Sequence, residues 1–122
     1  MTNLRVENLT QFVPAKNFDL SSRFYKDLGF SVVASIAKAV RFERDGCGFW
    51  LQDYYVEDWA GNFMFCLYVQ DLEAWWSHIK TMRFDHAYGG TAKVIAEPHT
   101  QEGGHMMQVS DLAGVLWHIR QD

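Results

Sequence analysis

The sequence predicts an α+β domain in which one order of elements, a strand, a helix and three strands, occurs twice. Two amphipathic helical stripes are each followed by short alternating strands with turn residues between them. Residues also recur at matched positions, because Asp19-Leu20 and Phe24 correspond to Asp71-Leu72 and Trp76. With 122 residues, 48% of them hydrophobic, the chain can form one packed domain. We therefore expect a single domain over residues 1–122, made of modules at about 8–56 and 62–121.

The first half is expected to open with a strand at Leu9–Val13, which Pro14 ends. A helix is predicted at Phe18–Leu28, where Asn17 or Asp19 can cap the start. Gly29 follows where a left-handed terminating residue belongs. The stripe of this helix consists of apolar residues at every fourth position: Leu20, Phe24 and Leu28.

Three strands are expected after this helix. The first two are Phe30–Ile36 and Ala39–Arg44, joined by a short turn. The run Arg44–Gly48 contains Asp-Gly, which is a hairpin signal, and it leads to a ring-rich strand at Phe49–Tyr55. A loop at Val56–Gly61 then separates the two halves.

The second half repeats the order. A strand is predicted at Asn62–Val69 and a helix at Asp71–Arg83, with Asp71 as its cap. The remaining elements are a short strand, a polar loop, a strand, a turn and a last strand: Lys93–Ala96, Glu97–Gly104, His105–Val109, Asp111–Gly114 and Val115–Arg120.

Charge and motifs restrict the function. The net charge of −4 argues against nucleic acid and anionic membranes as partners. No signal peptide, transmembrane span or lipidation motif is recognisable, so the cytoplasm is the expected compartment. Cys47 and Cys66 lie in apolar segments and are expected to be buried free thiols.

Three motifs carry a resemblance to a known family. The segment 24–30, FYKDLGF, resembles the F-Y-x-x-L-G-F signature of the glyoxalase, bleomycin-resistance and dioxygenase superfamily, also called the vicinal oxygen chelate superfamily. Residues 67–72, LYVQDL, resemble its central L-x-V-x-D-L, and residues 111–117, DLAGVLW, resemble its D-P-x-G-x-x-W/L ending. The three stand in the family's order, and the resemblance extends from about Leu9 to Arg120.

The resemblance implies paired β-α-β-β-β modules whose curled sheets enclose a cavity. In the bleomycin-resistance branch, two chains commonly exchange a strand and share two ligand sites. We therefore expect a strand-exchanged homodimer, which fits because a half-open sheet exposes an apolar face that a second module must cover.

Metal ligands of the family's enzymes come from four strands. The corresponding positions here are Thr10, Gln52, Met64 (Asn62 if the register shifts) and His118. Thr and Met replace the donors that Zn²⁺, Ni²⁺ or Fe²⁺ require, so neither a metal nor another cofactor is expected. A weak metal site that uses His99, His105 and His118 stays open.

Side-chain alternation along the strands then predicts a cavity lined by rings, a thioether, an amide and an imidazole. The expected ligand-binding residues are Trp50, Gln52, Tyr54, Asp58, Trp59, Met64, Glu102, His105 and His118. The loop acids could attract a cation that Trp59 stacks against, or they could simply be solvated while Trp59 packs on the partner. Bleomycin-resistance proteins often carry Trp where this chain has Glu102, which puts bleomycin itself in doubt.

The first functional hypothesis is a non-catalytic protein, without catalytic residues, that binds a planar aromatic or cationic molecule. The alternative is a family enzyme of lyase, dioxygenase or isomerase type with an atypical or absent metal site. In a metal-free isomerase, His118 would be the general base.

Overall fold

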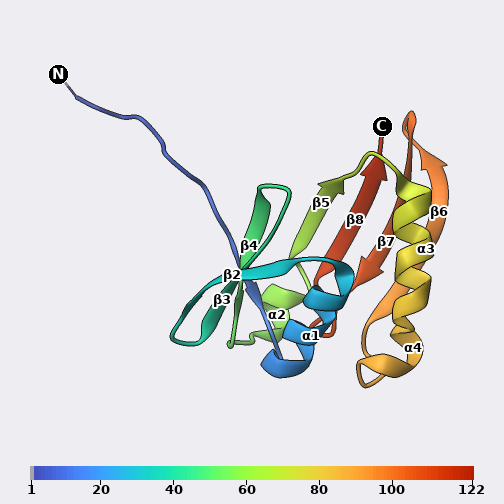
Figure 1. The fold of residues 1–122 in the computed structure, drawn as a ribbon, viewed down its shortest axis with the longest axis horizontal. Coiled ribbons are helices and arrows are strands. Elements are labelled where there is room, and N and C mark those ends of the chain that lie inside the picture. Colours follow the sequence, from blue (N-terminus) through green and yellow to red (C-terminus); the bar gives the residue numbers. More distant parts are fainter. Residues whose placement is uncertain (1) are drawn as a thin grey trace.

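The computed structural model describes residues 2–122 and contains two four-stranded sheets with the same topology (Figure 1). Their strand orders are β1-β4-β3-β2 and β5-β8-β7-β6. In each sheet the first pair is parallel and the others are antiparallel. The strands are β1 (Phe12–Pro14), β2 (Ser31–Ile36), β3 (Ala39–Arg44), β4 (Cys47–Gln52), β5 (Met64–Tyr68), β6 (Lys93–Gln101), β7 (Gly104–Ser110) and β8 (Leu116–Gln121). The predicted pair of modules and the α+β class are confirmed.

Both long helices begin at the side chains that the sequence indicates. In α1 (Phe18–Leu28), the Asn17 side chain accepts a hydrogen bond from the Leu20 N–H at 3.2 Å. In α3 (Leu72–Met82), the Asp71 carboxylate accepts one from the Ala74 N–H at 3.0 Å. Gly29 ends α1 with φ of 125°, a conformation that glycine adopts without strain.

The hairpin between β3 and β4 is also as predicted. Asp45 and Gly46 form its two-residue loop. Their φ values of 51° and 80° are both positive, as the type I′ turn of a β-hairpin requires. The prediction of buried thiols is wrong, because Cys47 and Cys66 are both free and exposed. Cys47 lies beside this turn, and Cys66 lies on the face of β5 that points away from the core.

The expected polar loop at residues 97–104 is wrong. Strand β6 continues through it to Gln101, and a second hairpin with positive φ at Glu102 and Gly103 leads directly into β7. Because β6 is an edge strand, its polar residues remain solvated and give no apolar alternation to detect.

Smaller differences occur at short elements. Strand β1 includes only Phe12–Pro14. Pro14 is accommodated there because β1 is also an edge strand, paired on one side only. Two helices of four residues, α2 (Glu57–Ala60) and α4 (Phe84–Ala87), were not expected. One helical turn is too short to produce an amphipathic pattern.

A buried hydrogen-bond network joins the two modules. The Tyr25 hydroxyl on α1 donates to Asp111 Oδ2 at 2.5 Å and accepts from Trp117 Nε1 at 3.0 Å. The second carboxylate oxygen of Asp111 accepts from the N–H groups of Ala113 and Val115, both at 2.9 Å. Burial raises the pKa of Asp111 to about 6, and these hydrogen bonds offset only part of the effect. The same burial, together with the charge of Asp111, raises the pKa of Tyr25.

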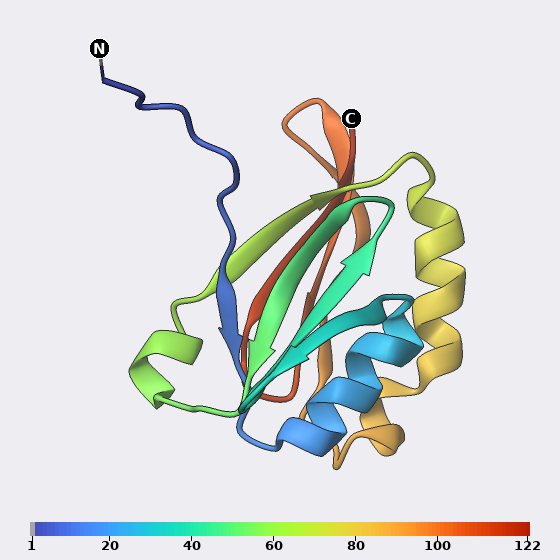
Figure 2. The same cartoon turned by 60° about the vertical axis from the view of Figure 1, so that its left-hand side comes forward.

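The N-terminal segment leaves the body of the domain as an extended arm (Figures 1 and 2). Residues 2–10 are all exposed, including Leu4, Val6 and Leu9, whose exposed fraction reaches 92% at Leu9. No helix in residues 2–122 has the length and apolar character needed to cross a bilayer.

Candidate ligand-binding site

Alternation along the central strands separates a core face from an open face. Phe49 and Leu51 of β4 are buried, and Trp117 of β8 is buried with them. Trp50, Gln52 and His118 point the other way and are half-buried. Figure 2 shows both long helices on one side of the sheets, so neither of them covers the opposite face. The side-chain directions expected from the sequence agree with this.

A hollow of about 420 Å³ lies on this open face at the end of β1 and β4. Trp59 on α2 is 64% exposed and Tyr54 is 52% exposed, and their ring centroids are 6.3 Å apart. The lining residues are Phe12, Pro14, Gln52, Tyr54, Trp59 and Phe63. The structure therefore brings together three of the predicted residues, Gln52, Tyr54 and Trp59.

Trp50 lies on the same face and stacks on Phe12. The two ring centroids are 5.9 Å apart and the rings are inclined by only 11°. Arg41 lies beside Trp50 in the neighbouring strand, and its guanidinium donates to Thr10 Oγ1 at 2.5 Å and to Glu43 at 3.1 Å. Sequence reasoning did not single out Phe12, although it lies two residues after Thr10 and therefore shares its face.

The open face of the second sheet is polar in its middle. Cys66, His118 and Gln108 lie opposite one another on β5, β8 and β7. The Gln108 side-chain N–H donates to His118 Nδ1 at 3.1 Å, so the neutral His118 ring carries its proton on Nε2. Met64 is 59% exposed and lies opposite Leu116. Gln108 was missed because only its pairing register places it beside His118.

The other predicted residues lie outside the 420 Å³ hollow. Asp58 is exposed on α2. Glu102 and His105 belong to the β6–β7 hairpin, where His105 Nδ1 is 3.2 Å from Thr100 Oγ1 and the Glu102 carbonyl accepts from Arg120 at 3.0 Å. Within one chain, these three residues and His118 do not join Gln52, Tyr54 and Trp59 in a single hollow.

The residues at the four family ligand positions do not fit a tightly bound transition metal. The Thr10 hydroxyl already contacts Arg41, and the thioether of Met64 is not a donor of the required kind. Within residues 2–122, no three His, Cys, Asp or Glu side chains are grouped so that they could hold a metal ion. Nδ1 of His99 contacts the Glu97 carbonyl oxygen, and Nε2 contacts the side-chain oxygen of Gln101. These two hydrogen bonds raise the pKa of His99.

Comparison with known proteins gives a consistent result. A sequence model of the glyoxalase/bleomycin resistance protein/dioxygenase superfamily matches residues 8–119. A bleomycin resistance protein of Klebsiella pneumoniae is 24% identical over 120 residues, which cover 95% of this chain and 93% of that one.

Solved structures also match over nearly the whole chain. A bleomycin-binding protein complexed with bleomycin has a TM-score of 0.78 and 26% identity, over 96% of this chain and 99% of that chain. A bleomycin resistance determinant encoded on the transposon Tn5 has a TM-score of 0.77 and 24% identity, over 96% and 98%. Lactoylglutathione lyase from Agrobacterium tumefaciens shares the fold, with a TM-score of 0.68 and 16% identity over 96% of this chain and 95% of that chain.

Proposed function

Because the chain belongs to the glyoxalase/bleomycin resistance protein/dioxygenase superfamily, we propose that it is a non-catalytic binding protein for a planar aromatic or cationic small molecule. The observation that carries this proposal is the ring-lined hollow of about 420 Å³ on the open face of the first sheet. Exposed rings beside a concavity are typical of ligand sites, since water solvates them poorly and a flat guest can stack on them.

The chemistry of the surrounding residues supports a cationic aromatic guest. Tyr54 and Trp59 offer π faces, which attract a cation as well as a ring. Asp58 is exposed one residue before Trp59, and the Gln52 amide provides one orienting hydrogen-bond group. Similarity to proteins that bind bleomycin favours a glycopeptide-sized molecule, and Glu102 in place of a stacking Trp favours one other than bleomycin.

We further propose that two chains form a homodimer by exchanging their N-terminal arms and that the protein acts in the cytoplasm. Leu4, Val6 and Leu9 would be buried against the partner instead of remaining in water. The ring-lined hollow of one chain would then face the second sheet of its partner, with His118, Glu102 and His105. This would complete a cavity that a single chain leaves open.

Ligand binding is tested by titrating the Trp fluorescence with bleomycin and with a panel of planar cations such as ethidium. We expect saturable quenching, and we expect the Trp59→Phe variant to lose most of the quenching that the wild type shows. Trp76→Phe, on α3 and away from the hollow, is the matched control. If no compound quenches up to millimolar concentration, the binding proposal is wrong.

The dimer is tested by sedimentation velocity on the full chain and on a variant that lacks residues 2–10. The full chain should sediment as a dimer and the shortened chain as a monomer. A monomeric full chain at micromolar concentration would exclude the shared cavity, while leaving the fluorescence titration as an independent measure of binding.

An enzyme of the same superfamily is a second candidate, and the orientation of His118 is the observation that favours it. Gln108 fixes the His118 ring on an open face and occupies Nδ1, so the neutral ring would offer Nε2–H as a positioned hydrogen-bond donor to a substrate oxygen, a role that differs from the general base expected from the sequence. Turnover that survives dialysis against a chelator and disappears in His118→Ala would replace the binding proposal. Stoichiometric metal in the purified protein would show that the side chains at the four family ligand positions do hold an ion.

A further inference from the structure

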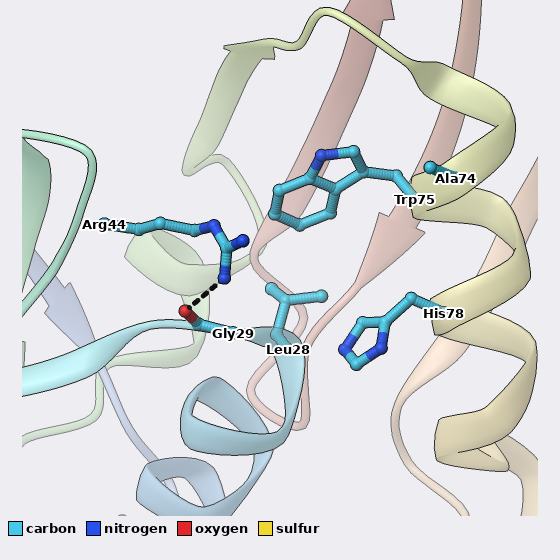
Figure 3. Close-up of a pocket in the computed structure, with 6 residues that line it drawn as sticks. All are labelled: Leu28, Gly29, Arg44, Ala74, Trp75 and His78. Carbon is cyan, nitrogen blue, oxygen red and sulfur yellow. Dashed lines mark hydrogen bonds between the residues drawn. The ribbon is translucent and has the colours of Figure 1, made fainter.

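A second hollow lies on the helix side of the molecule, where the two modules meet. Its volume is about 300 Å³, and the first module contributes Leu28, Gly29 and Arg44 while α3 contributes Ala74, Trp75 and His78 (Figure 3). It continues into a groove of about 570 Å³ that shares Arg44, Ala74 and Trp75 and extends to Phe30 and Tyr68. We call the two together the junction groove.

The apolar part of the junction groove suits a flat ring. Leu28 is 1% exposed and forms the floor, and the half-buried indole of Trp75 forms a wall. Figure 3 shows both side chains and the His78 ring pointing into one space. A volume of this size accommodates one or two fused rings, which would contact Leu28 on one face and Trp75 on the other.

The polar part of the junction groove is asymmetric. The Arg44 guanidinium lies 5.6 Å from the centre of the Trp75 ring, and its Nη1 donates to the Gly29 carbonyl at 2.9 Å. Those two contacts fix its plane. Its Nε lies 3.7 Å from the exposed Asp45 carboxylate, and its other terminal nitrogen donates to no acceptor within residues 2–122. On the other side, His78 Nε2 lies 2.7 Å from the Asp27 carbonyl and donates to it, so the neutral ring presents Nδ1 as an acceptor.

We propose that the junction groove is a second ligand site, which takes a planar aromatic carboxylate with its ring between Leu28 and Trp75 and its carboxylate on Arg44. A carboxylate is favoured over a neutral group because a hydrogen bond between two charged partners is roughly twice as strong as a neutral one. The positive charge and the indole are already held together before any ligand arrives, which reduces the entropy lost on binding. This site is independent of the ring-lined hollow, which lies on the other face of the sheets.

The five tryptophans allow the two sites to be separated in one experiment. Each indole N–H gives its own cross-peak in a ¹H–¹⁵N correlation spectrum: Trp50 and Trp59 report on the open face, Trp75 on the junction groove, Trp76 on the neighbouring helix surface and Trp117 on the core. We expect 1-naphthoate to shift the Trp75 signal in a saturable way and to leave Trp50 and Trp59 unchanged. The uncharged analogue 1-naphthalenemethanol should bind about tenfold more weakly.

Two variants test the contacts directly. Arg44→Gln should weaken 1-naphthoate binding about tenfold, while Lys26→Gln, an exposed cation on α1 outside the groove, should leave it unchanged. Ala74→Phe places a ring into the groove from an exposed helix position and should abolish binding. Ser77→Phe adds the same ring to the same helix, outside the groove, and should not.

Three results would overturn the proposal: shifts at Trp50 or Trp59 instead of Trp75, equal affinity for the acid and the alcohol, or unchanged binding in Ala74→Phe. Absence of any shift at millimolar 1-naphthoate would overturn it as well. Shifts at Trp50 or Trp59 would place 1-naphthoate on the open face, whereas the other results leave the proposal for that face untouched, because it rests on Trp59 quenching by planar cations.

Discussion

Replacing Asp111 by Asn should change how the stability of the protein depends on pH. The side chain of Asp111 is fully buried, and this burial raises its pKa from 3.8 to about 6. Asparagine is almost the same size, its carbonyl oxygen can accept the N–H groups of Ala113 and Val115, and its NH₂ group can donate to the Tyr25 oxygen. The substitution thus removes the titration and keeps most of the contacts; the Tyr25 O–H loses its acceptor, but that cost does not vary with pH across this range.

The direction and size of this change in stability follow from the linkage between proton binding and folding. Since the folded state holds the proton more tightly than the unfolded chain, Asp111 contributes its full stability below pH 3.8 and loses it as the pH rises through about 6. A pKa unit corresponds to about 1.4 kcal/mol, so the rise from 3.8 to about 6 corresponds to about 3 kcal/mol. At pH 4 part of the unfolded chain is already ionised, so the free energy of unfolding of Asp111→Asn minus that of the wild type should increase by most of this amount, about 2 kcal/mol, between about pH 4 and pH 8.

Urea unfolding at five pH values in this range measures the difference, in which the other titrating groups cancel. Asp45→Asn, at an exposed hairpin turn, controls for the loss of one negative charge. A difference that stays flat within about 0.5 kcal/mol, or one that decreases with pH, would contradict a raised pKa of Asp111 in the folded state and show that water or local opening solvates the carboxylate.

Three further substitutions test the packing and the caps. Tyr25→Phe removes the donor to Asp111 and leaves a buried indole N–H unpaired, so urea unfolding at pH 7 should show a loss of about 3 kcal/mol, and a loss below about 1 kcal/mol would contradict the network. Gly48→Ala places a Cβ 2.2 Å from the Phe42 carbonyl oxygen and should cost about 2 kcal/mol. Gly61→Ala meets its nearest atom at 3.4 Å and is the matched control, so an equal loss in both would count against a steric cause. Asp71→Ala removes the cap of α3 and should lower stability by about 1 kcal/mol, with helix loss visible by circular dichroism on heating; an unchanged melting curve would exclude the cap.

Elements that depend on a few neighbouring residues could be predicted from the sequence. The bounds of α1 agree with the expectation because Asn17 and Gly29 mark both ends within the chain itself. The Asp45-Gly46 hairpin is equally local. Strand β6 could not be delimited, because its second half is stabilised by pairing with β7 and not by its own apolar pattern.

Long-range contacts were beyond sequence reasoning, even where the residues were noticed. Tyr25 and the pair Asp111 and Trp117 belong to two of the family motifs, yet 86 and 92 positions separate Tyr25 from them. The hydrogen bonds among these three residues explain why the motifs contain them, because the bonds connect α1 to the β7–β8 turn and to β8. The composition of the open face could be predicted through alternation, whereas the grouping of Gln52, Tyr54 and Trp59 into one hollow depends on α2, which has no sequence signal.

The two open faces differ in a way that bears on ligand selectivity. The first sheet presents rings in register, with Trp50 stacked on Phe12, and the second presents hydrogen-bonding groups in register, with His118 held by Gln108. Stacking accepts many flat molecules, because every aromatic ring offers the same kind of face. Hydrogen bonds discriminate, because a buried polar group without a partner costs about 1–3 kcal/mol. If a dimer apposes the two faces, affinity should therefore vary little with the ring system of a planar cation and strongly with its hydrogen-bonding edge, and His118→Ala should reduce that second dependence while leaving stacking intact.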